Sequence, residues 1–130
     1  MAAIDTNILV RILINDPQEA TQTEIARQFL KQIKQVYVPQ IVQVECVWVL
    51  ERAYKIPKQK LIEILTSLYK SPVFMLQHES LFASALDKFS DSNVGFADCL
   101  ILAESQAKKL ELFTFDKKLG KIIGCKLLTQ

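Results

Sequence analysis

The chain alternates short apolar runs with longer segments in which apolar residues recur at helical spacing. The short runs predict strands at residues 2–4, 36–38, 73–76, 112–115 and 125–128. The periodic segments predict helices at 7–13, 17–33, 58–69, 81–89 and 96–109, with a further brief helix after Asp116. Strands separated by helices, without room for hairpins, are typical of a parallel sheet covered on both faces, so we expect an α/β fold with a three-layer α/β/α sandwich.

Residues 40–54, QIVQVECVWVLERAY, fit two kinds of element. The many valines favour a strand, but fifteen residues without a turn signal is long for a strand and ordinary for a helix. We predict a helix. If this segment were a central strand, Glu45 would point away from the other acids discussed below.

The 130 residues suffice for one domain, residues 1–130, and 50% of them are hydrophobic, which indicates a well-packed core. The net charge of +2 does not by itself indicate a polyanionic partner, although the lysine-rich segment after Lys108 is either a solvated surface or a site that attracts phosphates. No apolar run approaches the roughly 18 residues of a membrane helix, and the start does not resemble an export signal. We therefore expect a cytoplasmic protein without a membrane partner.

The chain has 3 cysteines, Cys46, Cys99 and Cys125. Their odd number indicates reduced core residues and not a disulfide framework.

Two acidic residues follow predicted strands. Asp5 comes after the first strand, and Asp116 comes after the strand at 112–115. Because the carboxyl ends of parallel strands meet at one edge of a sheet, both acids are expected at that edge, where ligands bind in open α/β sheets. Two more acids, Glu45 and Asp98, interrupt strongly apolar helices near their starts.

Each aspartate has a purely structural explanation. An aspartate at the start of a helix caps the backbone N–H groups, and an acid in the first turn is favoured by the helix dipole. Glu45 is harder to explain in this way, because Val44, Cys46 and Val47 around it suggest that it borders the core. An unpaired carboxylate there is costly, so we expect Glu45 to have a partner.

If the four acids converge, a divalent cation is the simplest counterion. Carboxylates about 4–6 Å apart resist ionisation together unless a cation neutralises them. Carboxylate oxygens, without histidine or cysteine in the set, suit Mg²⁺ or Mn²⁺ better than zinc. Such an ion activates water and shields a phosphate, which is the arrangement for metal-assisted phosphodiester hydrolysis.

Four motifs in this order resemble those of PIN-domain ribonucleases of the VapC toxin type, over nearly the whole chain. They are IDTNIL near the start, QVECVWVL, FADCLILAES and LFTFDKKL. The resemblance implies that Asp5, Glu45, Asp98 and Asp116 bind one or two Mg²⁺ or Mn²⁺ ions and cleave RNA.

The resemblance also implies roles for other residues. Thr6 and Asn7 match positions that brace the first aspartate, and Thr114 matches the hydroxyl residue two positions before the last acid. Asp91 matches an occasional additional acid at the rim of the site, or satisfies backbone amides in a loop. Arg11 either approaches a phosphate or pairs on the surface.

The implied partners are an RNA substrate, a small antitoxin protein and a second copy of the chain. Apolar surface around Phe29, Trp48 and Tyr54 would serve pairing or antitoxin docking, unless these side chains are simply part of the core.

Three alternatives remain on the sequence alone. A haloacid-dehalogenase-type phosphatase would need a second aspartate as proton donor where this chain has Asn7, which counts against it. A PIN-like module without activity is the second alternative, against which the intact set of four acids argues. Histidine chemistry is the third, but the sole histidine, His78, lies at a predicted strand end, and we assign it no catalytic role.

Overall fold

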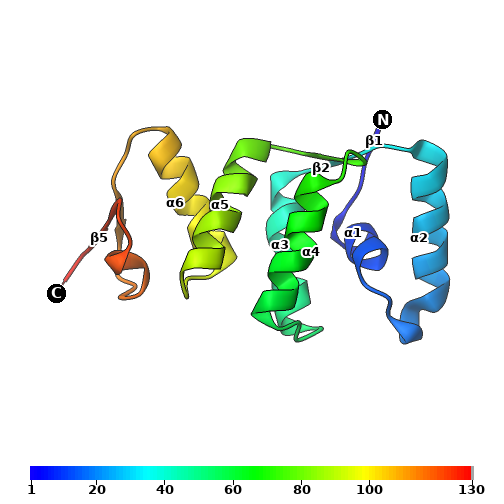
Figure 1. Cartoon of the computed structure of the whole chain (residues 1–130), viewed down its shortest axis with the longest axis horizontal. Coiled ribbons are helices and arrows are strands. Elements are labelled where there is room, and N and C mark those ends of the chain that lie inside the picture. The colour runs from blue at the N-terminus through cyan, green and yellow to red at the C-terminus, as the bar shows by residue number, and fades with distance from the viewer. Residues whose placement is uncertain (130) are drawn as a thin grey trace. The chain divides into compact units, whose positions relative to one another are not determined.

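The structure is a computed structural model that describes residues 1–129 (Figure 1). The chain forms two compact units, one comprising Met1–Glu79 and the other beginning at Ser80. The first unit contains, in order, β1 (Ala2–Ala3), α1 (Thr6–Leu13), the 3₁₀ helix η1 (Pro17–Glu19), α2 (Ala20–Ile33), β2 (Val36–Val38), α3 (Gln40–Arg52), α4 (Lys58–Lys70) and β3 (Phe74–Leu76). The second contains α5 (Glu79–Asp91, which starts at the boundary), α6 (Phe96–Ala107), β4 (Leu112–Thr114), the 3₁₀ helix η2 (Leu119–Lys121) and β5 (Cys125–Leu127).

The first unit is built on a three-stranded parallel sheet in the order β1-β2-β3. Its central strand supplies Val36 and Val38, which are both 0% exposed. Helix α1 packs against both α2 and α3, and its Leu9 and Val10 are fully buried. The near-continuous burial of β2 is what a parallel strand covered on both faces requires.

A buried amide fixes where α3 starts relative to the sheet. Gln43 is 1% exposed, and its Nε2 donates to the carbonyl oxygens of Val38 (3.2 Å) and Gln77 (2.8 Å). These carbonyls lie at the ends of β2 and just after β3, and the side chain of Gln77 in turn accepts from the backbone N–H of Gln40 (2.8 Å). The first turns of α3 are therefore held at the carboxyl edge of the sheet.

The second unit has an aromatic cluster and a two-stranded parallel sheet. The Phe96 ring lies 5.5 Å from that of Phe82 and 5.9 Å from that of Phe89, measured between centroids, which joins α5 to α6. Strand β4 pairs with β5 in parallel, with Thr114 opposite Leu127. Tilted and edge-on aromatic pairs of this kind stabilise a core beyond the area that they bury.

The predicted elements are confirmed, including the parallel strands and the helix within residues 40–54. The strands form two separate sheets, however, with β1 in one and β4 in the other, so the prediction that Asp5 and Asp116 follow strands of a single sheet was wrong. Some boundaries differ. The helix predicted at 17–33 is divided into η1 and α2, because Asp16 Oδ1 caps Gln18 N at 2.9 Å and starts a separate short turn. Helix α6 ends at Ala107, where Lys108 N bonds the carbonyls of both Glu104 and Ser105 and Lys109 takes a left-handed conformation (φ 59°).

Asp91 was expected in the loop SDSNVGF, but it is the last residue of α5. The helix continues past Phe89, so the loop begins only at Ser92. Within residues 1–129, each helix is too short or too polar to cross a membrane.

Replacing the central aromatic residue of the second unit tests this packing. We expect Phe96→Leu to lower the free energy of unfolding by about 1–3 kcal/mol, because the smaller side chain loses both ring contacts and leaves space in the core. Phe115→Leu, the same substitution at a side chain that is 69% exposed, should change it by less than about 0.5 kcal/mol. Urea unfolding followed by circular dichroism measures both, and equal losses would contradict the assignment of Phe96 to the core.

Candidate functional site

Asp5 is placed by the first strand and the first helix together. The backbone N–H of Ile4 continues the β1–β2 ladder by donating to the Tyr37 carbonyl at 3.1 Å. Asp5 is then the N-cap of α1, in an extended conformation, and its Oδ1 accepts from Ile8 N at 3.1 Å. The residue is exposed, so the strand delivers a carboxylate to the surface at its carboxyl end.

Glu45 projects from α3 toward the start of α1. Its Oε1 accepts a hydrogen bond of 2.9 Å from the Thr6 hydroxyl. The expectation that Glu45 borders the core was wrong, because Cys46 and Val47 face inward, at 1% and 2% exposure, while Glu45 is exposed. Glu45 does have a partner, as we predicted. That partner is Thr6, for which the resemblance implied support of Asp5 and not of Glu45. Thr6 thereby links the helix that Asp5 caps to Glu45.

A cavity of about 240 Å³ opens beside Asp5, between α1 and α2. Asn7, which is exposed, and Phe29, which is half-buried, line it, and so does Arg11. The Arg11 side chain is only 14% exposed and donates to Gln22 Oε1 and to the Tyr54 hydroxyl, both at 2.9 Å. Arg11 was considered either to approach a phosphate or to pair on the surface, and these contacts match the pairing role.

In the second unit, Asp98 lies in the first turn of α6 and is half-buried. It does not cap the helix, because the N-cap is Gly95. Burial raises the pKa of the Cys125 thiol, and the negative charge of Asp98 raises it further, which places the carboxylate near β5. Because Cys125 is only partly buried, the expectation that all three cysteines belong to the core was wrong for this one, although all three are reduced.

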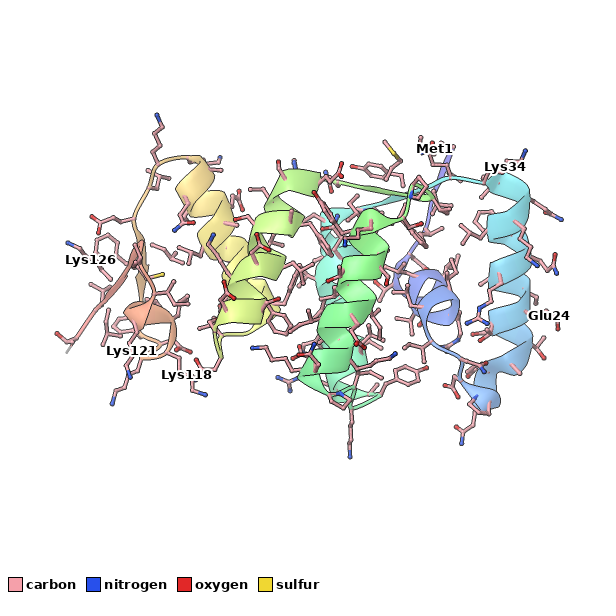
Figure 2. The ribbon with its side chains drawn as sticks, in the orientation of Figure 1. Met1, Glu24, Lys34, Lys118, Lys121 and Lys126 are labelled. Atoms are coloured by element: carbon pink, nitrogen blue, oxygen red, sulfur yellow. The ribbon has the colours of Figure 1, made fainter. Side chains whose placement is uncertain are left out.

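Asp116 is exposed and is fixed by two hydrogen bonds after β4. Its Oδ1 accepts from Leu119 N at 3.0 Å, and its own N–H donates to the Thr114 hydroxyl at 3.0 Å. Thr114 thus holds the backbone that carries this acid, which is compatible with the supporting role that the motif implies. Exposed lysines follow in the chain, and Figure 2 shows Lys118, Lys121 and Lys126 projecting outward.

Three of the four predicted acids keep acceptor positions beyond their hydrogen bonds. An ionised carboxylate offers about four acceptor positions, so the single hydrogen bonds to Asp5, Glu45 and Asp116 leave room for a metal. Over residues 1–129, the ion pairs of the protein involve none of the four acids. Among the described residues, no group of three or more His, Cys, Asp or Glu side chains that could hold a metal ion is found within either unit. Paired carboxylates complemented by water suit a hard cation that keeps several of its own waters.

Sequence reasoning missed Gln22 and Gln43, and it considered Tyr54 only for a docking surface or the core, not for the polar contacts that it makes. Trp48, considered for the core, is 57% exposed, with the Arg52 guanidinium 5.3 Å from its ring centroid. Tyr54 is half-buried, and its hydroxyl donates to Asp16 Oδ2 at 2.8 Å. In the sequence, Arg11 and Asp16 flank a short apolar segment. This pattern indicates that both side chains need polar partners, but it does not identify those partners.

Comparison with known proteins gives two matches. The family model described as PIN domain matches residues 2–124. A protein from Aquifex aeolicus (strain VF5) named VapC ribonuclease is 25% identical over 129 residues, which cover 94% of this chain and 92% of that protein. The family match spans both compact units.

Two substitutions of Asp5 separate its capping role from its charge. Asparagine caps about as well as aspartate, whereas alanine costs about 0.5–2 kcal/mol at an N-cap. We therefore expect Asp5→Asn to unfold at nearly the wild-type urea concentration and Asp5→Ala to unfold earlier. If both variants matched the wild type, the cap on Ile8 would contribute nothing to stability.

The Cys125 thiol reports on the position of Asp98. Because the pKa of Cys125 is raised, its thiolate forms at higher pH than usual, so alkylation by iodoacetamide should be slow at pH 8 and accelerate as the pH rises. Asp98→Asn removes the negative charge, which lowers the pKa and should speed alkylation at pH 8. Mass spectrometry of the modified peptide measures the rate, with Asp87→Asn, an exposed acid on α5, as the control. Cys46, whose pKa burial raises to about 12, should remain unmodified.

Proposed function

The chain belongs to the PIN domain family, and on that premise we propose that it is a metal-dependent endoribonuclease that hydrolyses RNA phosphodiester bonds. The observation that carries the proposal is the exposed carboxylate of Asp5 at the carboxyl end of a parallel strand, with Glu45 held at the start of the same helix by Thr6. The name of the Aquifex relative, VapC ribonuclease, supports RNA as the substrate. The phosphatase alternative loses its basis with the family assignment.

We assign the metal ligands to Asp5, Glu45, Asp98 and Asp116. A bound Mg²⁺ or Mn²⁺ would lower the pKa of a coordinated water and neutralise charge on the phosphate. The protein's own contribution is to orient the carboxylates. Thr6 does so through its hydrogen bond to Glu45, and Thr114 does so through the backbone of Asp116.

The same proposal extends to the setting of the enzyme. The single nuclease domain would comprise residues 1–130, in the cytoplasm, as the toxin of a toxin–antitoxin pair. Its partners would be an antitoxin protein and a second copy of the chain. Asn7 would support Asp5 from the cavity wall that both residues share.

RNA cleavage tests the proposal directly. The purified protein should cleave a mixed RNA pool with Mn²⁺ or Mg²⁺ and stop when a chelator is added. Asp5→Asn and Asp98→Asn should each lower the rate by at least about 100-fold, because loss of a metal ligand should cost no less than loss of the groups that orient one. Gel analysis of the cleaved RNA gives the rate.

The matched control is Asp87→Asn, which removes an exposed carboxylate outside the assigned set and should cleave at the wild-type rate. Equal cleavage by the wild type and Asp98→Asn would indicate a contaminating nuclease. No cleavage with either metal would favour a PIN-like module that binds without catalysis.

A further inference from the structure

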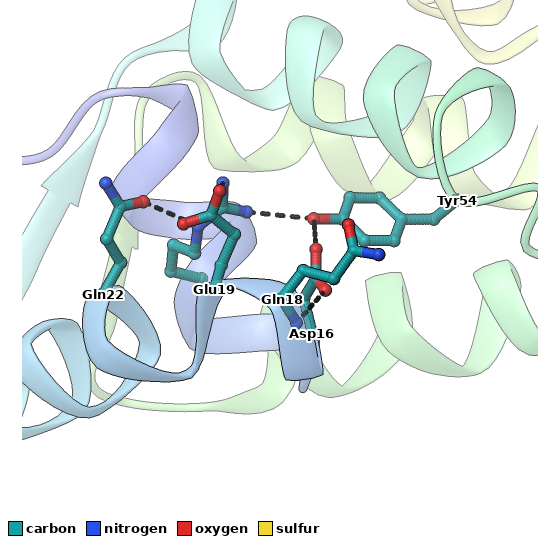
Figure 3. A network of polar contacts seen from close by, with 6 residues as sticks. Asp16, Gln18, Glu19, Gln22 and Tyr54 are labelled. Atoms are coloured by element: carbon teal, nitrogen blue, oxygen red, sulfur yellow. Dashed lines mark hydrogen bonds and ion pairs between the residues drawn. The ribbon is translucent and has the colours of Figure 1, made fainter.

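A polar network joins α1, η1, α2 and the end of the α3 segment in the first unit (Figure 3). The Arg11 guanidinium, in the last turn of α1, donates to Gln22 on α2 and to the Tyr54 hydroxyl just after α3. It also lies 3.9 Å from the Glu19 carboxylate. The Tyr54 hydroxyl in turn donates to Asp16 Oδ2 at 2.8 Å, and the other carboxylate oxygen of Asp16 caps η1. Figure 3 shows that the contacts meet at the Tyr54 hydroxyl, which is bonded to Asp16 on one side.

Helix α1 needs external contacts to hold its position. It has eight residues, fewer than the roughly 12–15 that give even a marginally stable isolated helix. It follows a strand of two residues, which offers few ladder hydrogen bonds. Its rotation and translation are therefore set by packing and by polar cross-links to its neighbours.

Two cross-links join α1 to the α3 segment, one near each end of α1. The Thr6–Glu45 hydrogen bond fixes the end next to Asp5, and the Arg11–Tyr54 hydrogen bond fixes the other. Two separated links restrain rotation and sliding together with the packing of Leu9 and Val10, whereas with one link alone only this non-directional packing opposes a pivot of α1 about that link. Loss of the distal link should therefore displace Asp5 relative to Glu45.

We propose that Arg11 and Tyr54 are positioning residues that set the geometry of the Asp5 and Glu45 carboxylates. This inference rests on the proposed function, since it assigns the network a purpose at that same metal site. Arg11 suits the role because its planar guanidinium directs donors to α2 and the α3 segment at once, which a lysine ammonium cannot reproduce with the same geometry. Tyr54 suits it because one hydroxyl accepts from Arg11 and donates to Asp16.

The test uses Tyr54→Phe and Arg11→Lys in the full chain, with Mn²⁺ affinity measured by isothermal titration calorimetry. We expect the Mn²⁺ dissociation constant to rise about threefold to tenfold, below the roughly 10- to 100-fold that follows loss of a group bonded directly to a metal ligand. Cleavage of RNA should recover toward the wild-type rate at saturating Mn²⁺, because the ligands themselves are intact.

Thr66→Val is the matched control. It removes a half-buried hydroxyl that donates to the Ile62 carbonyl at 2.7 Å on α4, in the same unit. If the network only stabilised the fold, this control and Tyr54→Phe would behave alike at a temperature where circular dichroism shows both folded. A weaker Mn²⁺ affinity in Tyr54→Phe and not in Thr66→Val supports positioning.

A second comparison keeps the test decisive even where one variant is unstable. In a Thr6→Val background the proximal link is already absent, so Tyr54→Phe should raise the dissociation constant by a smaller factor than in the wild type. Unchanged Mn²⁺ affinity in both Tyr54→Phe and Arg11→Lys, with an active wild type, overturns the positioning role and leaves the nuclease intact. A wild type that neither binds Mn²⁺ nor cleaves RNA overturns both proposals.

Discussion

The hydrogen bond between Thr6 and Glu45 is the contact on which the arrangement of the first unit's acids depends. Strand β1 has two residues and α1 has eight, so neither element is stable without its surroundings. Burial of Leu9 and Val10 holds α1 against its neighbours, but apolar packing is not directional. The orientation of α1 about its axis, and with it the position of Asp5, requires hydrogen bonds with defined partners.

The aspartates show how a structural role and the proposed metal-binding role are compatible in one residue. Asp5 and Asp116 each use one oxygen to bind the backbone N–H three residues on, which is ordinary helix-start chemistry. That bond also fixes the orientation of the carboxylate and leaves acceptor capacity on it. Capping and metal binding therefore do not compete, and a capped aspartate is a better-oriented ligand than a freely rotating one. Asp98 differs, because it lies inside the first turn and is held by the helix that carries it.

The sequence was sufficient for the elements because local signals define them. The Asp16–Pro17 pair, the apolar spacing of α4 and the alternation of strands with helices all act over a few residues. The helix predicted within residues 40–54, observed at Gln40–Arg52, followed from the length of the apolar run together with the resemblance to PIN-domain ribonucleases. What sequence could not supply was side-chain direction and long-range pairing. The exposed position of Glu45 depends on which face of α3 meets the sheet, and that is set by Gln43 bonding to strand ends. The hydrogen bond from Tyr54 to Asp16 joins residues 38 positions apart, and no local pattern in the sequence predicts such a pairing.

Electrostatics separates the four candidate acids from Glu19, which pairs with Arg11. Arg11, on the helix that Asp5 caps, directs its charge to Glu19 and its hydrogen bonds to Gln22 and Tyr54. In the part of the chain that the structure describes, the ion pairs leave Asp5, Glu45, Asp98 and Asp116 without a basic partner. The carboxylates of Asp5, Glu45 and Asp116 are exposed and each accepts a hydrogen bond, which orients them and leaves acceptor positions for a cation from solution. If the Arg11 guanidinium paired with Asp5, it would compete with a metal ion for that carboxylate. It bonds to Tyr54 and Gln22 instead, and these bonds help to hold α1 in place.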